Sequence, residues 1–171
     1  MFVNTPFKQP SRSQLNRIQK ALTETPHTLL AYTDGIDDLL RLMQRISLQS
    51  GLAIYSWSSG RGLVSLKSRD VPVPGTRGLS DALRYADRSS HYGVYLFSAH
   101  SRDELVEMQA VLPKHRSWEA LHDKKKLMFV LPAGQKVPAL ESSEYVKLIN
   151  LDSPRAARVG LRDGQWVSLD G

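Results

Sequence analysis

Residues 28–46 read Thr-Leu-Leu-Ala-Tyr-Thr-Asp-Gly-Ile-Asp-Asp-Leu-Leu-Arg-Leu-Met-Gln-Arg-Ile, and this stretch decides the fold class. Its first six residues form a compact apolar run, which predicts a buried strand. The apolar residues from Ile36 to Ile46 then recur at the spacing of one helix face. Asp34 lies between the two patterns, where an aspartate can cap a helix, and Gly51 is placed to end that helix. The stretch therefore predicts a strand, a tight turn and an amphipathic helix.

The same alternation of strand and helix patterns continues along the rest of the chain. Helices are expected over 13–23, from Ser80, from Ser101 and as a short turn near Trp118, and strands over 53–58, 91–99, 127–131 and 145–151. Apolar strands separated by amphipathic helices imply a three-layer α/β domain with a mainly parallel, five-stranded sheet. Residues 64–78 contain prolines and glycines without a sustained period, and they are expected to form a long surface loop.

The length and composition favour one globular domain with two appendages. The chain has 171 residues, of which 41% are hydrophobic and 23% are charged, as in ordinary folded domains. We expect an N-terminal arm over 1–12, the α/β domain over 13–152 and a tail over 153–171. The turn signal Asp163-Gly164 predicts a small hairpin or an added edge strand within the tail.

Cysteine content and charge restrict the chemistry that the chain can perform. The chain has no cysteine, which excludes disulfides, thiolate nucleophiles and cysteine-based metal sites. No export signal or membrane-spanning run is visible, so a cytoplasmic location is expected. The net charge of +6 allows a polyanionic partner such as nucleic acid, but basic and acidic residues alternate along the chain, as on an ordinary solvated surface.

The turns that follow two of the expected strands lack the residues that nucleotide hydrolysis requires. A phosphate-binding loop needs several glycines, a lysine and a hydroxyl residue, whereas the first strand is followed by the acidic turn Asp34-Gly35. The strand that would end in a magnesium-binding acid ends in Ser98-Ala99-His100. We therefore predict no ATP hydrolysis, no catalytic residues and no cofactor. Asp34 with the two acids after Ile36 could hold a metal ion, but helix capping explains these acids more simply, and no metal site is predicted.

Three arginines near the second strand are candidates for binding a phosphate group. Arg61, in the turn Gly60-Arg61-Gly62, together with Arg69 and Arg77 could form a cationic mouth over the carboxyl end of the sheet. The alternative is a solvated loop. The candidate ligand site consists of these arginines and of residues in neighbouring turns, namely Asp34, Gly35, Arg61, Gly62, Arg69, Arg77 and His100.

The tail contains candidate residues for binding a partner, whereas the aromatic residues of the second strand are expected in the core. Arg158, Arg162 and Trp166 are candidates for binding a partner, since an exposed tryptophan near an edge often marks a contact. Burial of Trp166 in the domain's own core is the alternative. Tyr55 and Trp57 alternate with smaller residues, which favours core packing over stacking on bases.

One family resemblance is carried by several of these segments. The strand 28–33 with its acidic helix, the segment Ile54-Tyr55-Ser56-Trp57-Ser58 followed by Gly60-Arg61-Gly62-Leu63, and the segment Leu127-Met128-Phe129-Val130-Leu131-Pro132 before Val137-Pro138 are the matching parts. Over residues 13–152 the chain resembles the N-terminal, degenerate RecA-like domain of the chloroplast and cyanobacterial type of AAA+ ATPases. That domain precedes an active motor domain, so the resemblance implies a degenerate P-loop fold with a regulatory or assembly role.

These observations predict a non-catalytic, pseudo-ATPase-like module that binds a protein, as an accessory subunit of a larger bacterial machine. Self-association is a further prediction. One alternative is a sensor of a nucleotide or cyclic dinucleotide that uses the basic loop. A second alternative is a nucleic-acid-binding protein, whose affinity would fall steeply with salt.

Overall fold

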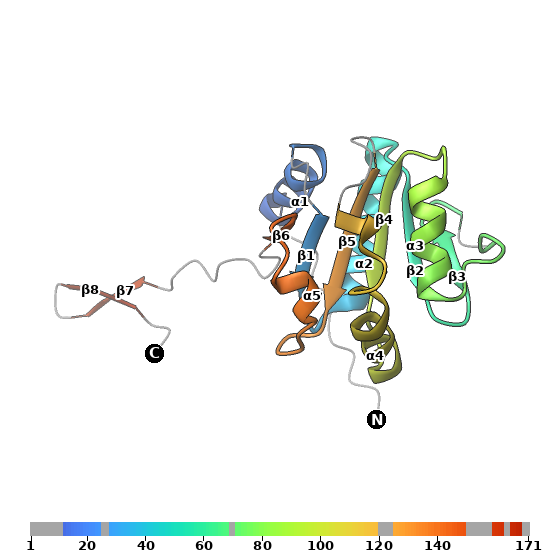
Figure 1. Cartoon of the computed structure of the whole chain (residues 1–171). Coiled ribbons are helices and arrows are strands. Elements are labelled where there is room, and N and C mark those ends of the chain that lie inside the picture. The colour runs from blue at the N-terminus through green and yellow to red at the C-terminus, as the bar shows by residue number, and fades with distance from the viewer. Residues whose placement is uncertain are drawn as a thin grey trace, which may run out of the picture.

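The computed structural model describes residues 12–24, 28–68, 71–119, 125–149, 159–162 and 165–168, which form a three-layer α/β fold (Figure 1). The elements are α1 (Arg12–Glu24), β1 (Thr28–Tyr32), α2 (Ile36–Ser50), β2 (Ile54–Ser58), β3 (Gly62–Ser65), α3 (Leu79–Arg88), β4 (Gly93–Ser98), α4 (Arg102–Val111), the 3-10 helix η1 (Arg116–Glu119), β5 (Lys125–Leu131), α5 (Pro138–Glu141), β6 (Val146–Ile149), β7 (Val159–Arg162) and β8 (Gln165–Ser168). The main sheet has the order β3-β2-β4-β5-β1-β6. Within this sheet all neighbouring strands are parallel except the pair β2–β3. The expectation of a mainly parallel sheet is confirmed.

The prediction of five strands in this sheet was wrong, because part of the expected loop 64–78 belongs to β3. Gly60 and Gly62 adopt φ values of +88° and +92°, which lets the chain reverse and pair β3 with β2. The following residues run along the outer edge of β3. The N–H of Val73 donates to the carbonyl oxygen of Leu63 at 2.8 Å, and Thr76 Oγ1 accepts from the N–H of Leu63 at 2.9 Å. The loop therefore covers part of an otherwise open sheet edge.

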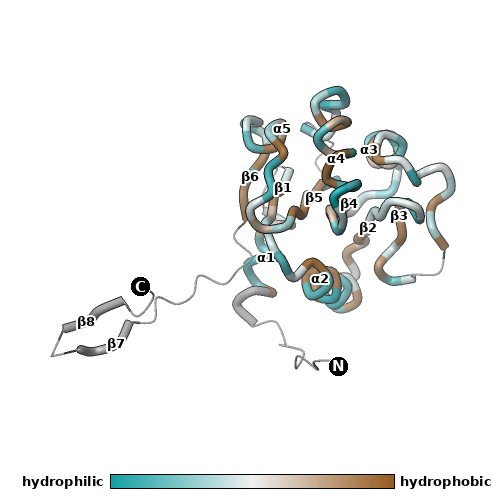
Figure 2. Tube along the Cα trace, turned by 90° about the horizontal axis from the view of Figure 1, so that it is seen from below, coloured by the Kyte–Doolittle hydropathy of each residue, from teal (hydrophilic) through white to brown (hydrophobic). Residues whose placement is uncertain are grey.

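Helices cover the two faces of the sheet unequally. Figure 2 shows α1 and α2 on one face and α3, α4 and α5 on the other. Each face has its own apolar cluster, because successive residues of a strand point to opposite sides. Leu29 of β1 packs in the cluster under α1 and α2, whereas its neighbour Leu30 packs in the cluster under α3, α4 and α5. The sheet thus has a separate apolar core on each face.

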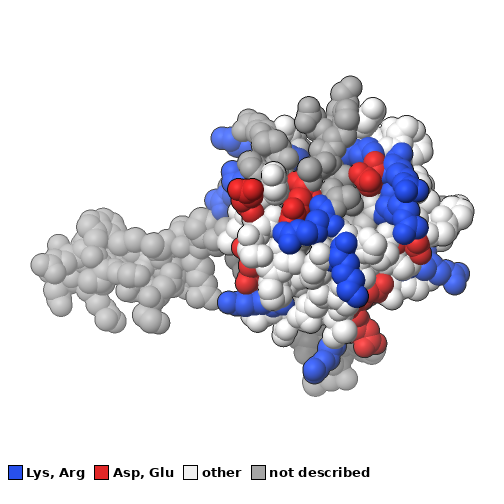
Figure 3. Space-filling view, viewed as in Figure 1, with Lys and Arg blue, Asp and Glu red and all other residues white. Residues whose placement is uncertain are grey.

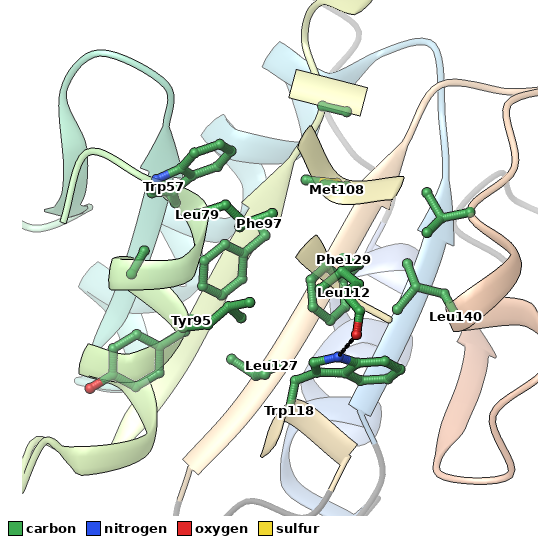
Figure 4. Packing of buried hydrophobic residues seen from close by; sticks show 14 of the residues in the cluster. Trp57, Leu79, Tyr95, Phe97, Met108, Leu112, Trp118, Leu127, Phe129 and Leu140 are labelled. Atoms are coloured by element: carbon green, nitrogen blue, oxygen red, sulfur yellow. Dashed lines mark hydrogen bonds between the residues drawn. The ribbon is translucent and has the colours of Figure 1, made fainter. Parts of the chain in front are cut away.

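The cluster on the α3 side contains the buried aromatic residues Trp57, Tyr95, Phe97, Trp118 and Phe129 (Figure 4). The rings of Phe97 and Phe129 stack with centroids 5.5 Å apart, and Trp118 meets Phe129 edge-on at 5.8 Å. Trp118 Nε1 donates to the carbonyl oxygen of Leu112 at 3.0 Å. Trp57 is fully buried, so its interpretation as a core residue is confirmed.

The two strands β7 and β8 form a separate antiparallel pair. Their register matches Val159 with Ser168 and Leu161 with Trp166, as in the hairpin that the turn signal predicts. Residues 1–11 of the expected arm lie outside the described residues. Within the part of the chain that the structure describes, no helix combines the length and apolar character needed to cross a membrane.

Candidate functional site

The turn between β1 and α2 is short, and its polar groups bind one another or the neighbouring turn. Three residues separate Tyr32, the end of β1, from Ile36, the start of α2. Thr33 Oγ1 accepts from the N–H of Gly35 at 3.0 Å, and Asp34 Oδ1 accepts from the N–H of Ala133 at 3.1 Å. The prediction that Asp34 caps α2 was wrong, because Gly35 is the N-cap residue and no side chain caps the helix. Asp34 instead joins this turn to the turn that follows β5.

A second turn at the same edge of the sheet leads from β4 into α4. Ser101 is the N-cap residue, and its side chain accepts from the N–H of Glu104 at 3.2 Å, which confirms the expected helix start. Glu104 Oε2 accepts from the N–H of His100 at 3.2 Å, one residue before the partner that a capping box would use. Ser98, at the end of β4, is fully buried. Among the described residues its Oγ has no hydrogen-bond partner.

A cavity of about 460 Å³ lies beside these turns, on the face of the sheet that carries α1 and α2. We name it the α2–β2 cavity, and it is lined by Asp37, Leu40, Arg41, Ser56, Ser58, Arg61, Val64, Leu66, His100 and Glu104. Its polar floor comes from the alternation of β2, which directs Trp57 to the opposite core and places Ser56 and Ser58 along the cavity. Ser56 pairs with Leu96 of the neighbouring strand β4, and Leu96 belongs to the apolar cluster on this face. Because a serine side chain is smaller than a leucine side chain, β2 leaves space here.

Two arginines and two acids lie around this cavity. Arg61 comes from the β2–β3 turn, and Arg41 lies one helical turn after Asp37 on α2. Arg41 also approaches Asp38, with 3.7 Å between Nη1 and Oδ1, but both side chains are more than half exposed, so this pair adds little to stability. Glu104 is 8% exposed and is engaged by the N–H of His100. The cavity is thus lined by charged side chains of both signs.

The structure brings together some of the sequence-predicted ligand residues but not others. Arg61 and His100 line the α2–β2 cavity. Asp34 and Gly35 lie in the β1–α2 turn and do not line it. Arg77 is exposed and does not line the cavity, and its carbonyl oxygen accepts from Trp57 Nε1 at 3.2 Å.

Gly62 and Arg69 were also predicted to belong to this site, and only Gly62 can be placed in the structure. At Gly62 an added Cβ would lie 2.5 Å from Thr76 Oγ1, so this glycine permits the close approach of the edge loop. Arg69 lies outside the described residues. Arg162 and Trp166 belong to β7 and β8, and Arg158 lies outside the described residues.

Sequence reasoning missed the contributions of Arg41, Ser56 and Ser58 to a common cavity. Two signals were available. The alternation of β2 places both serines on one face, and the spacing of Asp37 and Arg41 places these two on one side of α2. Whether the serine face of β2 meets this side of α2 depends on the angle at which α2 crosses the sheet. Neither segment determines that angle alone.

Two other titratable groups, on Tyr32 and Lys126, form hydrogen bonds between secondary-structure elements. Tyr32 OH donates to Glu141 Oε1 at 2.7 Å, and partial burial together with this carboxylate raises the pKa of Tyr32 to about 12. Lys126 Nζ donates to the carbonyl oxygen of Ala21 at 3.0 Å, and burial lowers the pKa of this lysine. No group of three or more histidine, aspartate or glutamate side chains that could hold a metal ion is found within the described residues.

The surface charge is mixed. Figure 3 shows lysine and arginine side chains spread over the face that it presents, with acidic side chains among them. The sequence matches no protein-family model and no curated protein.

Proposed function

We propose that this chain is a non-hydrolysing module of the RecA-like kind that acts as a regulatory or assembly subunit by binding another protein. The β1–α2 turn carries the proposal. A phosphate-binding loop offers free N–H groups and a lysine to its nucleotide, whereas here the N–H of Gly35 donates to Thr33 and the carboxylate of Asp34 faces the same edge. A triphosphate at this position would meet an acidic group in a turn of three residues that contains no lysine.

The strand order supports the RecA-like part of the proposal. In chain order the five parallel strands are β1, β2, β4, β5 and β6, and the sheet places the first strand between the fourth and the fifth. RecA-like domains have this order, and their magnesium-binding acid follows the third strand. The third parallel strand here is β4, which ends in Ser98 and is followed by Ala99 and His100. Both positions used for hydrolysis thus carry other residues.

The edge strand β6 supports the protein-binding part. Among the described residues β6 pairs with β1 alone, so its other edge has no strand beside it. Leu148 of this strand is 60% exposed, and the preceding Tyr145 is 45% exposed. An open edge with exposed apolar side chains is a surface to which another chain can add a strand.

Two measurements test the proposal on the full chain. Purified protein with ATP and Mg²⁺ should release no phosphate above the buffer rate, and turnover that is lost on changing Asp34→Ala would contradict the non-hydrolysing assignment. Affinity capture from the cells that make the protein should recover a stoichiometric partner. Capture should fail with Leu148→Lys and survive with Val106→Lys, a matched change at an exposed apolar residue of α4. Recovery of no partner by the unchanged chain would contradict the binding role.

A further inference from the structure

We propose that the α2–β2 cavity binds a small phosphate ester, specifically a phosphorylated nucleoside. This goes beyond the protein-binding role and uses residues separate from the β6 edge. It also differs in position from the closed β1–α2 turn, since neither Asp34 nor Gly35 lines the cavity. The volume of about 460 Å³ lies within the roughly 300–1,000 Å³ that small-molecule sites occupy.

The donors around the cavity suit a phosphate group. Arg41 and Arg61 reach it from two different elements, α2 and the β2–β3 turn. A guanidinium group can donate two parallel hydrogen bonds to phosphate oxygens, and two such groups together neutralise a dianion. Ser56 and Ser58 add hydroxyl donors from the floor. An anion with several acceptor oxygens suits this set of side chains.

Ser98 of β4 lies next to Ser58, which is on the floor of the cavity. The register pairs Trp57 with Phe97, so the next residues along the two strands, Ser58 and Ser98, lie side by side. Ser98 is fully buried, and its Oγ is without a partner within the described part of the chain. Because a buried hydroxyl without a hydrogen bond is costly, most such groups in folded proteins are satisfied. Ser98 does not itself line the cavity, so it shows only that the polar character of the floor at Ser58 continues into the neighbouring strand.

The acids and the apolar residues indicate what accompanies the phosphate. Glu104 is already engaged by the N–H of His100, which leaves Asp37, in the first turn of α2, as the carboxylate facing a ligand. A carboxylate accepts hydrogen bonds from hydroxyl or amino groups, which a sugar or a base carries. Leu40, Val64 and Leu66 offer apolar contacts for a flat ring. A phosphorylated nucleoside combines a phosphate group, hydroxyl and amino donors, and a flat ring. Inorganic phosphate has only the first of these.

Thermal unfolding of the full chain with defined ligands tests this proposal. The probes are AMP, GMP, CMP and UMP, with the corresponding nucleosides, inorganic phosphate and cyclic dinucleotides for comparison. At about 100 times its dissociation constant, a bound monophosphate should raise Tm by roughly 5–10 °C. The nucleosides and phosphate alone should bind at least about 10-fold more weakly. No shift with any nucleotide at millimolar concentration overturns the proposal, and equal binding of phosphate or tighter binding of a cyclic dinucleotide overturns its assignment to one nucleoside.

Variants locate the site and include a matched control. Arg61→Ala should weaken binding by at least about 10-fold, because hydrogen bonds to a charged phosphate are lost. Ser56→Val removes a floor hydroxyl while keeping a residue that suits a strand, and it should weaken binding as well. Arg84→Ala removes an exposed arginine of α3 that pairs with Asp81 much as Arg41 pairs with Asp38, and it should bind like the unchanged chain. Binding that survives in Arg61→Ala and Ser56→Val would place the ligand elsewhere and overturn the proposal, without bearing on partner capture through Leu148.

Discussion

The β1–α2 turn and the α2–β2 cavity lie at the same carboxyl edge of one sheet, but they differ in how their polar groups are used. In the turn, Thr33 and Asp34 accept hydrogen bonds from the backbone of Gly35 and Ala133. Beside the cavity, Ser98 is buried without a partner in the described part of the chain, and two arginines face the open space. The two places thus differ: the side chains of the turn are tied to neighbouring backbone groups, whereas the cavity leaves space beside its polar side chains.

Two glycines in turns at this edge differ in the room that they leave for a side chain. Replacing them should give the largest difference in the free energy of unfolding. Gly62 has a φ of +92° and no room for a Cβ, whereas Gly35 has a φ of −95° and its nearest added contact would be an ordinary 3.5 Å. Gly62→Ala should lower the free energy of unfolding by about 3 kcal/mol, from backbone strain plus displacement of Thr76. Gly35→Ala should change it by less than about 1 kcal/mol. Urea unfolding of both variants checks the pair, and equal losses would contradict the described turn geometries.

Two hydroxyl residues sharpen the comparison with effects of opposite sign. Thr33→Val removes an acceptor of the Gly35 N–H and should destabilise the chain by about 1 kcal/mol. Ser98→Ala removes a buried hydroxyl without a partner and should leave stability unchanged or raise it by about 1 kcal/mol when no ligand is present. Chemical unfolding of the ligand-free protein distinguishes the two. A clear loss of stability in Ser98→Ala would show that this hydroxyl already has a partner.

The smallest expected effect concerns Tyr32, at the end of β1. Burial and the neighbouring Glu141 raise its pKa from 10.0 to about 12, so the folded state holds the phenolic proton more tightly than the unfolded state. The stabilisation is present in full below pH 10 and is lost as the pH rises from 10 to about 12. Tyr32→Phe should remove this part of the alkaline destabilisation, by less than about 1 kcal/mol because the side chain is partly exposed. Unfolding at pH 9 and pH 11.5 measures it, with Tyr145→Phe as the exposed control; identical pH dependence in all three proteins would contradict the Tyr32–Glu141 bond.

Local sequence patterns predicted most of the elements of the sheet. The apolar runs at 28–33, 91–99 and 127–131 each contain a strand, and the helix expected from Ser101 is α4, of which Ser101 is the N-cap residue. The strand β3 was missed because it has four residues, and its stability depends on pairing with β2 and on the loop that crosses its edge. Short strands of this kind carry too little local pattern to be distinguished from a loop.

The candidate site was predictable in part. Arg61 and His100 were selected because they follow strands, and strand ends meet at one edge in any parallel sheet. Arg41 was not selected because a residue inside a helix becomes part of a site by the angle at which that helix lies on the sheet. Asp34 was expected to cap α2, but the helix begins one residue too late for that contact, and a turn from a distant strand takes its carboxylate instead.

The sequence by itself determined the alternation of strands and helices and the absence of a phosphate-binding loop, because both depend on neighbouring residues. Only the tertiary structure decided that β3 joins the sheet, that Arg77 does not line the cavity, and that Ser56, Ser58 and Arg41 line one space. The physical reason is that cavities form between elements. Their walls depend on which strand lies beside which and on how far each helix extends over the sheet, and those relations are set by packing over the whole core.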